Sequence, residues 1–73
     1  MAYKESDPTL KKAADDEPIF VLRAKDKLAP IVVETWAMIA KLMGVSEDKI
    51  TEATDCAIEM YRWQDKNGCK IPD

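Results

Sequence analysis

The chain has 73 residues, of which 47% are hydrophobic and 34% charged, with a formal net charge of −3. This length allows one small domain, and a chain of about 60 residues buries only about 60% of the surface that it exposes when unfolded. The 14 acidic and 11 basic residues are mixed along the chain, which argues against a nucleic-acid binder that works by neutralising phosphates.

The sequence offers few groups for catalysis or metal binding. It has no histidine, and Cys56 and Cys69 do not form a CxxC pair, so we expect no structural zinc. It also lacks a glycine-rich phosphate loop and a G-x-S-x-G nucleophile turn. We therefore expect a protein that is not an enzyme and that needs no cofactor or metal. Whether the two cysteines are free or joined in an oxidising compartment stays open.

Residues 1–17 are polar and are expected to form a flexible N-terminal arm. Asp7 and Pro8 suit the start of a brief helix through Ala14, but so short a helix is marginal in water. The start of the chain has no apolar run typical of a secretory signal, and no stretch is long and apolar enough for a membrane span. We expect a cytoplasmic protein without a membrane partner.

Residues 18–24 form a short apolar segment. Its β-branched and aromatic residues behind Pro18 favour an extended conformation, and a helix that begins at Pro18 is the alternative. A single strand cannot satisfy its own backbone groups. An extended segment would therefore pair with a second copy or lie across the helices.

A first helix is predicted over residues 30–43, with Pro30 in its first turn and Gly44 as a left-handed cap. It is apolar on nearly every side, and Glu34, Thr35 and Lys41 are its polar members. A helix that faces one core needs an apolar stripe of only about 100°. A chain this short cannot cover the remaining sides, so neighbouring copies or another protein must cover them. The sequence does not separate these two cases, and we expect a homo-oligomer.

A second helix is predicted over residues 46–67. Ser46 is its expected N-cap, Val45 and Ile50 have the spacing of a hydrophobic staple, and Gly68 follows its end. Because the connection between the helices is so short, they are expected to form an antiparallel hairpin. The predicted fold is therefore mainly α: a hairpin domain over 18–68, with a tail at 69–73.

Two groups of residues are candidates for binding. Large apolar side chains on the first helix and the preceding segment are predicted to form an interface: Ile19, Phe20, Leu22, Val33, Trp36, Ile39 and Met43. Cationic groups and an aromatic ring suit an anionic, nucleotide-like ligand through charge-assisted bonds and stacking. The residues predicted for that ligand are Arg23, Lys25, Trp36 and Arg62.

The pattern DEPIFVLRAxDxLAP at residues 16–30, followed by Val33 and Trp36-Ala37, is similar to small uncharacterised proteins of tailed phages and prophages. The similarity extends to about residue 63. It implies an accessory protein that acts in the cytoplasm of a bacterial host. Such proteins often inhibit or sequester a host component, and the helical-hairpin architecture resembles the phage oligomers that sequester cyclic nucleotides in anti-defence.

Three functions are consistent with these features. The first is a non-enzymatic, oligomeric interaction protein that binds and inhibits a host protein. The alternatives are an oligomeric sponge for an anionic nucleotide-like ligand and a small structural protein of a virion or its assembly. The sequence does not identify the target, the ligand or the number of subunits.

Overall fold

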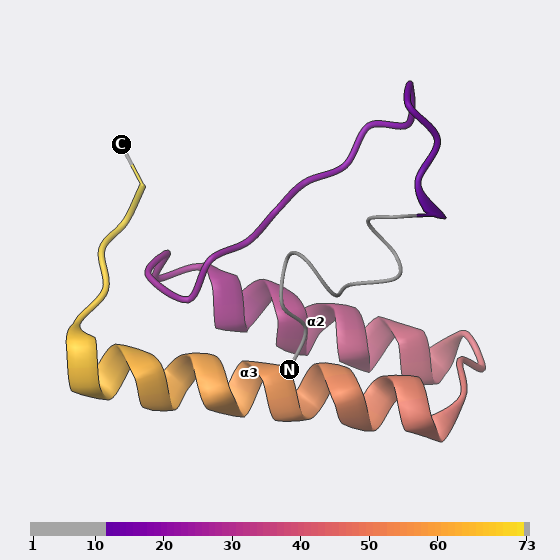
Figure 1. The fold of residues 1–73 in the computed structure, drawn as a ribbon. Coiled ribbons are helices and arrows are strands. Elements are labelled where there is room, and N and C mark those ends of the chain that lie inside the picture. The colour runs from indigo at the N-terminus through magenta and orange to yellow at the C-terminus, as the bar shows by residue number, and fades with distance from the viewer. Residues whose placement is uncertain (1–11, 73) are drawn as a thin grey trace.

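A computed structural model describes residues 12–72 and shows two helices packed against each other (Figure 1). Helix α2 spans Ala29–Leu42 and helix α3 spans Glu47–Asn67. The predicted mainly helical fold and its helical hairpin are confirmed. The predicted helix from Asp7 to Ala14, and most of the predicted N-terminal arm, lie outside the described residues.

Local sequence signals set both ends of α2. Pro30 lies in its first turn, where the missing N–H breaks no hydrogen bond. At the other end Gly44 has a φ of +82°, a conformation that costs glycine little. The N–H of Val45 donates to the carbonyl of Ala40 at 3.0 Å, and the N–H of Gly44 donates to that of Lys41 at 3.3 Å. This pair of bonds is a Schellman motif, and it ends the helix where the sequence predicted.

Helix α3 begins after Ser46, as predicted, but the expected side-chain cap is absent. The Ser46 hydroxyl makes no capping hydrogen bond, so that part of the prediction is wrong. Its backbone carbonyl accepts the first helical bond, from the N–H of Ile50 at 3.1 Å. Glu47 and Asp48 lie in the first turn, where their negative charge interacts favourably with the positive end of the helix dipole. The start of the helix therefore depends on backbone bonding and acidic residues.

The segment at 18–24 forms neither a helix nor a paired strand in the single chain. Residues 17–23 have no regular secondary structure and residues 24–25 form a turn, so the alternative of a helix from Pro18 is wrong. Figure 1 shows this segment looping away from the two helices. A strand needs a neighbour with which to pair, and the described part of the chain contains only the isolated parallel bridge between Asp26 and Lys70.

The C-terminal tail fixes the turn that precedes α2. The N–H of Lys27 donates to the carbonyl of Lys70 at 2.9 Å, and the N–H of Lys70 donates to that of Lys25 at 3.0 Å. From α3, the amide nitrogen of Gln64 donates to the carbonyls of Ala24 at 2.9 Å and Asp26 at 3.0 Å. Two segments more than 40 residues apart are thereby held together.

Small side chains form the contact between the helices. Among the described residues, the buried apolar ones are Ala29, Pro30, Ala37, Ala40 and Ala57. A methyl-sized group contributes about 0.8 kcal/mol on burial, against about 1.5–3 kcal/mol for a large apolar side chain. The hydrophobic core of the single chain is therefore small, and the large apolar residues lie mostly outside it.

Within the part of the chain that the structure describes, neither helix has both the length and the apolar character required to cross a membrane.

Candidate interaction surface and binding hollows

Large apolar side chains cover much of the surface of α2 and of the segment before it. Phe20 is 83% exposed, Leu42 81% and Met43 78%. Soluble monomers rarely expose contiguous apolar patches larger than a few hundred Å², and larger ones mark interaction sites. We call the following set the apolar face, and it comprises residues exposed by 47% or more: Ile19, Phe20, Val21, Leu28, Ile31, Val32, Trp36, Met38, Ile39, Leu42 and Met43.

The residues predicted for an interface fall into two groups in the structure. Five are exposed members of the apolar face: Ile19, Phe20, Trp36, Ile39 and Met43. Leu22 and Val33 are half-buried and line a groove beside that face. All seven therefore lie on the apolar face or border it.

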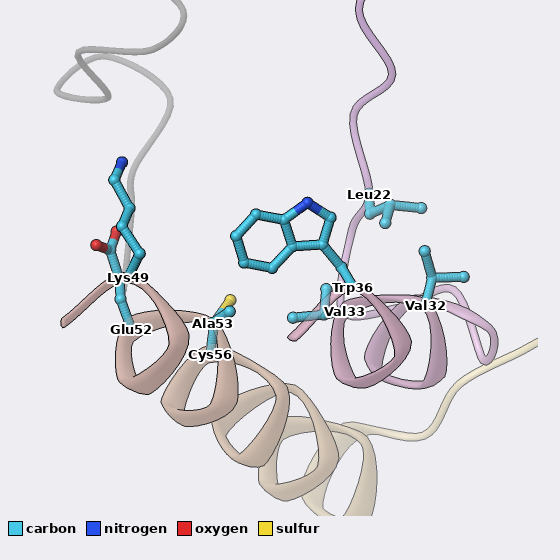
Figure 2. Close-up of a pocket in the computed structure, with 8 residues that line it drawn as sticks. All are labelled: Leu22, Val32, Val33, Trp36, Lys49, Glu52, Ala53 and Cys56. Atoms are coloured by element: carbon cyan, nitrogen blue, oxygen red, sulfur yellow. The ribbon is translucent and has the colours of Figure 1, made fainter. Parts of the chain in front are cut away.

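An apolar groove of about 360 Å³ lies between α2 and α3. Figure 2 shows the indole ring of Trp36 extending toward Ala53 and Cys56 of α3, with Leu22 of the preceding segment on the other side of the ring. The polar residues of the groove, Lys49 and Glu52, belong to α3. The groove therefore suits an apolar side chain from a segment that also places polar groups near Lys49 and Glu52 of α3.

Both cysteines are free thiols in the structure. Cys56 is half-buried in the wall of the groove, and Cys69 is exposed in the tail. The question that the sequence left open, whether the two cysteines are joined, is answered for the single chain: they are not bonded to each other.

A polar contact joins the helices at Glu34 and Tyr61. The Tyr61 hydroxyl hydrogen-bonds to the Glu34 carboxylate, which raises the pKa of Tyr61, with smaller contributions from desolvation and from the carboxylate charge. The sequence pattern indicated only that Glu34 marks a polar edge of the first helix. The partner could not be predicted, because it depends on the rotation of α3 against α2.

The four residues predicted for a nucleotide-like ligand do not line one hollow within a single chain. Trp36 lines the apolar groove, whereas Arg23 and Lys25 line a second hollow of about 150 Å³. Arg62 donates to Glu59 at 3.1 Å on the exposed surface of α3. The second hollow also includes Lys70, which sequence reasoning missed because no pattern in the tail indicates where it folds.

Among residues 12–72 no three histidine, cysteine, aspartate or glutamate side chains are placed to hold a metal ion together. The chain matches no protein-family model, no curated protein and no solved structure.

Proposed function

We propose that this chain is the subunit of a homo-oligomer that works by binding and not by catalysis, and that its subunit is an antiparallel two-helix hairpin. The observation that carries the proposal is the exposure of the large apolar side chains over a core made of alanines. Burial of these side chains against another molecule provides stabilisation that a single chain of this size lacks.

The amount of exposed surface supports this proposal. The chain exposes 6245 Å², whereas a compact monomer of 8.2 kDa exposes about 4,500 Å². The total includes the irregular segment at 17–23 as well as the apolar face. A second copy that covered the exposed apolar side chains would reduce this surface, and a standard interface takes roughly 800 Å² from each partner.

A second copy is the occupant that we propose for the apolar face. The same patch on two subunits can meet around a two-fold axis without any further adaptation. Phe20 lies two residues before Leu22, which already lines the groove of its own chain. We propose that Phe20 of one copy enters the groove of the other and packs against Trp36.

The oligomer is proposed to act on a component of a bacterial host, and the support for this is the similarity of residues 16–63 to phage accessory proteins. A binding role also fits the lack of histidine in the sequence, since histidine is the usual general base near neutral pH. The remaining surface of the assembled oligomer would contact the host component.

Sedimentation velocity and native mass spectrometry on the full chain test the assembly. Phe20→Asp and Ile39→Asp place a charge where the proposed interface is dry, and we expect both variants to sediment as monomers. Both positions are exposed in the single chain, so the helical circular dichroism should persist. Thr51→Asp, at an exposed polar site on α3, is the matched control and should keep the wild-type mass.

A wild-type chain that remains a folded monomer up to millimolar concentration would contradict the proposal. So would Asp variants with unchanged mass. A closed oligomer of one fixed mass supports a binding protein, whereas an open series of masses favours the structural alternative.

A further inference from the structure

Residues 18–22, which we call the edge segment, leave their backbone groups without hydrogen-bond partners. Within residues 12–72 no backbone hydrogen bond begins or ends in this segment, although such bonds close the turns on both sides of it. In Figure 1 it runs as a drawn-out stretch of chain and not as a coil. Unpaired N–H and C=O groups in a row are a template for pairing with another chain.

The side chains of the edge segment divide by position. In an extended chain successive side chains point to opposite faces, so Phe20 and Leu22 share one face and Ile19 and Val21 share the other. Leu22 lines the apolar groove of its own chain, whereas Phe20 is 83% exposed. The face that carries Leu22 is therefore turned towards the groove, and its largest side chain lacks cover.

Pro18 decides which backbone groups of the edge segment can pair. In an antiparallel ladder, residues alternate between positions that bond the opposite strand through N–H and C=O and positions that do not. Proline has no N–H and belongs at a position that does not bond. Phe20 and Leu22 then occupy positions of the same kind, and Ile19 and Val21 present their N–H and C=O groups to the opposite strand.

We infer that the edge segments of two copies pair as an antiparallel ladder about a two-fold axis at Phe20, with Ile19 of one copy opposite Val21 of the other. The inference rests on the proposed homo-oligomer and specifies how its subunits meet. A two-fold axis perpendicular to the strands makes two identical segments antiparallel. Each pair of Ile19 and Val21 exchanges both of its N–H···O bonds.

The turns on either side of the edge segment select this register over its two neighbours. A ladder centred one residue earlier would need the N–H of Glu17, which already donates to the carbonyl of Ala14 at 3.0 Å. A ladder centred one residue later would need the carbonyl of Arg23, which already accepts from the N–H of Asp26 at 2.9 Å. The ladder centred on Phe20 uses groups that are unpaired in the described part of the single chain.

The same register explains how Phe20 reaches the groove of the other copy. Diagonal neighbours on one face of an antiparallel pair lie about 7–8 Å apart, within reach of an aromatic side chain. Phe20 of one copy is the diagonal neighbour of Leu22 of the other, and Leu22 lines the groove that contains Trp36. The ladder therefore agrees with the proposed packing of Phe20 against Trp36.

Amide hydrogen exchange tests the ladder on the full chain, at a concentration at which sedimentation shows the oligomer. After correction for intrinsic rates, the amides of Ile19 and Val21 should exchange at least about tenfold more slowly than those of Phe20 and Leu22. Equal exchange at the four positions in an oligomer of fixed mass would overturn the inference and leave the proposed assembly intact. A chain that stays monomeric would contradict both.

Cysteine cross-linking tests the register, in chains whose own cysteines are removed by Cys56→Ala and Cys69→Ser. Chains with Ile19→Cys and chains with Val21→Cys are mixed in equal amounts and oxidised, and mass spectrometry separates the mixed dimer from the two symmetric ones. A disulfide needs Cα atoms within about 7 Å, which residues directly opposite each other satisfy better than identical residues on a diagonal.

We expect the mixed dimer in at least about fivefold excess over the two symmetric dimers together. Linked dimers in the proportions of random pairing would show that the edge segments meet without this register, and would overturn the inference. An oligomer that yields no linked dimer would overturn it as well. Both variants keep Phe20, so the proposed contact with Trp36 is present in every chain of the mixture.

Discussion

Glu34 and Tyr61 form a polar contact between α2 and α3, whose buried apolar residues are small. The hydrogen bond from the Tyr61 hydroxyl to the Glu34 carboxylate raises the pKa of Tyr61 above its ordinary value. The neutral tyrosine is therefore the form that stabilises the folded chain.

This contact predicts a loss of stability at alkaline pH. Because the pKa of Tyr61 is higher in the folded chain, its stabilisation is complete below the unfolded value of about 10 and is lost as pH rises through the folded value. Thermal unfolding of the wild type and of Tyr61→Phe, from about pH 8 to about pH 11, measures this loss of stability.

We expect the wild type to be more stable than Tyr61→Phe at the lower pH, and the difference to shrink towards the upper end of this range. Lysines titrate in both proteins, so the difference between them isolates Tyr61. A difference that stays constant across the range would contradict the assignment.

The turn before α2 and the tail after α3 behave as one element because Gln64 holds them. Its amide group donates to two backbone carbonyls, those of Ala24 and Asp26. No local pattern predicted this, since the partners lie about 40 residues away in the chain. The second hollow, at Arg23, Lys25 and Lys70, lies at this junction and depends on the arrangement that Gln64 stabilises.

Gln64→Glu should release this element. A carboxylate of the same shape cannot donate to either carbonyl, and we expect unfolding free energy to fall by about 1–3 kcal/mol. The amides of Lys27 and Lys70 should exchange with solvent faster, because their hydrogen bonds close the same turn. Chemical denaturation and hydrogen exchange measure the two effects.

Asn67→Asp is the matched control for this change. The Asn67 side chain donates to the carbonyl of Trp63, one turn earlier in α3, at 3.0 Å. The Asn67→Asp variant has the same amide-to-acid change as Gln64→Glu, also near the C-terminus of α3, where negative charge is unfavourable. Equal losses in Gln64→Glu and Asn67→Asp would show that the helix dipole, and not the bridging bonds, explains the effect.

At the scale of the whole molecule, the apolar face leaves large side chains of the single chain exposed. The buried apolar residues are mostly alanines, whereas side chains such as Met38 and Leu42 remain in contact with water. A second copy that covers this face would bury them. We propose that the activity against a host component depends on the assembled form.

Expression in bacterial cells tests that requirement. The wild type and Thr51→Asp should slow growth, whereas Ile39→Asp, expressed to the same level, should not, because it lacks the assembled surface. Growth curves at matched protein levels provide the measurement. If the wild type has no effect on growth, inhibition of a host component is contradicted, and assembly stands on its own test.

The sequence by itself determined the helices, because the signals that begin and end them are local. Pro30, Gly44 and the acidic turn after Ser46 act within a few residues of their own positions. The apolar pattern of residues 31–43 also predicted, without any structure, that one chain leaves α2 uncovered.

Only the tertiary structure decided which residues meet. It paired Glu34 with Tyr61, divided the predicted ligand residues between two hollows, and brought Lys70 beside Lys25. These contacts depend on the rotation of one helix against the other and on the path of the tail. Both are set by packing between distant segments, so no local sequence pattern records them.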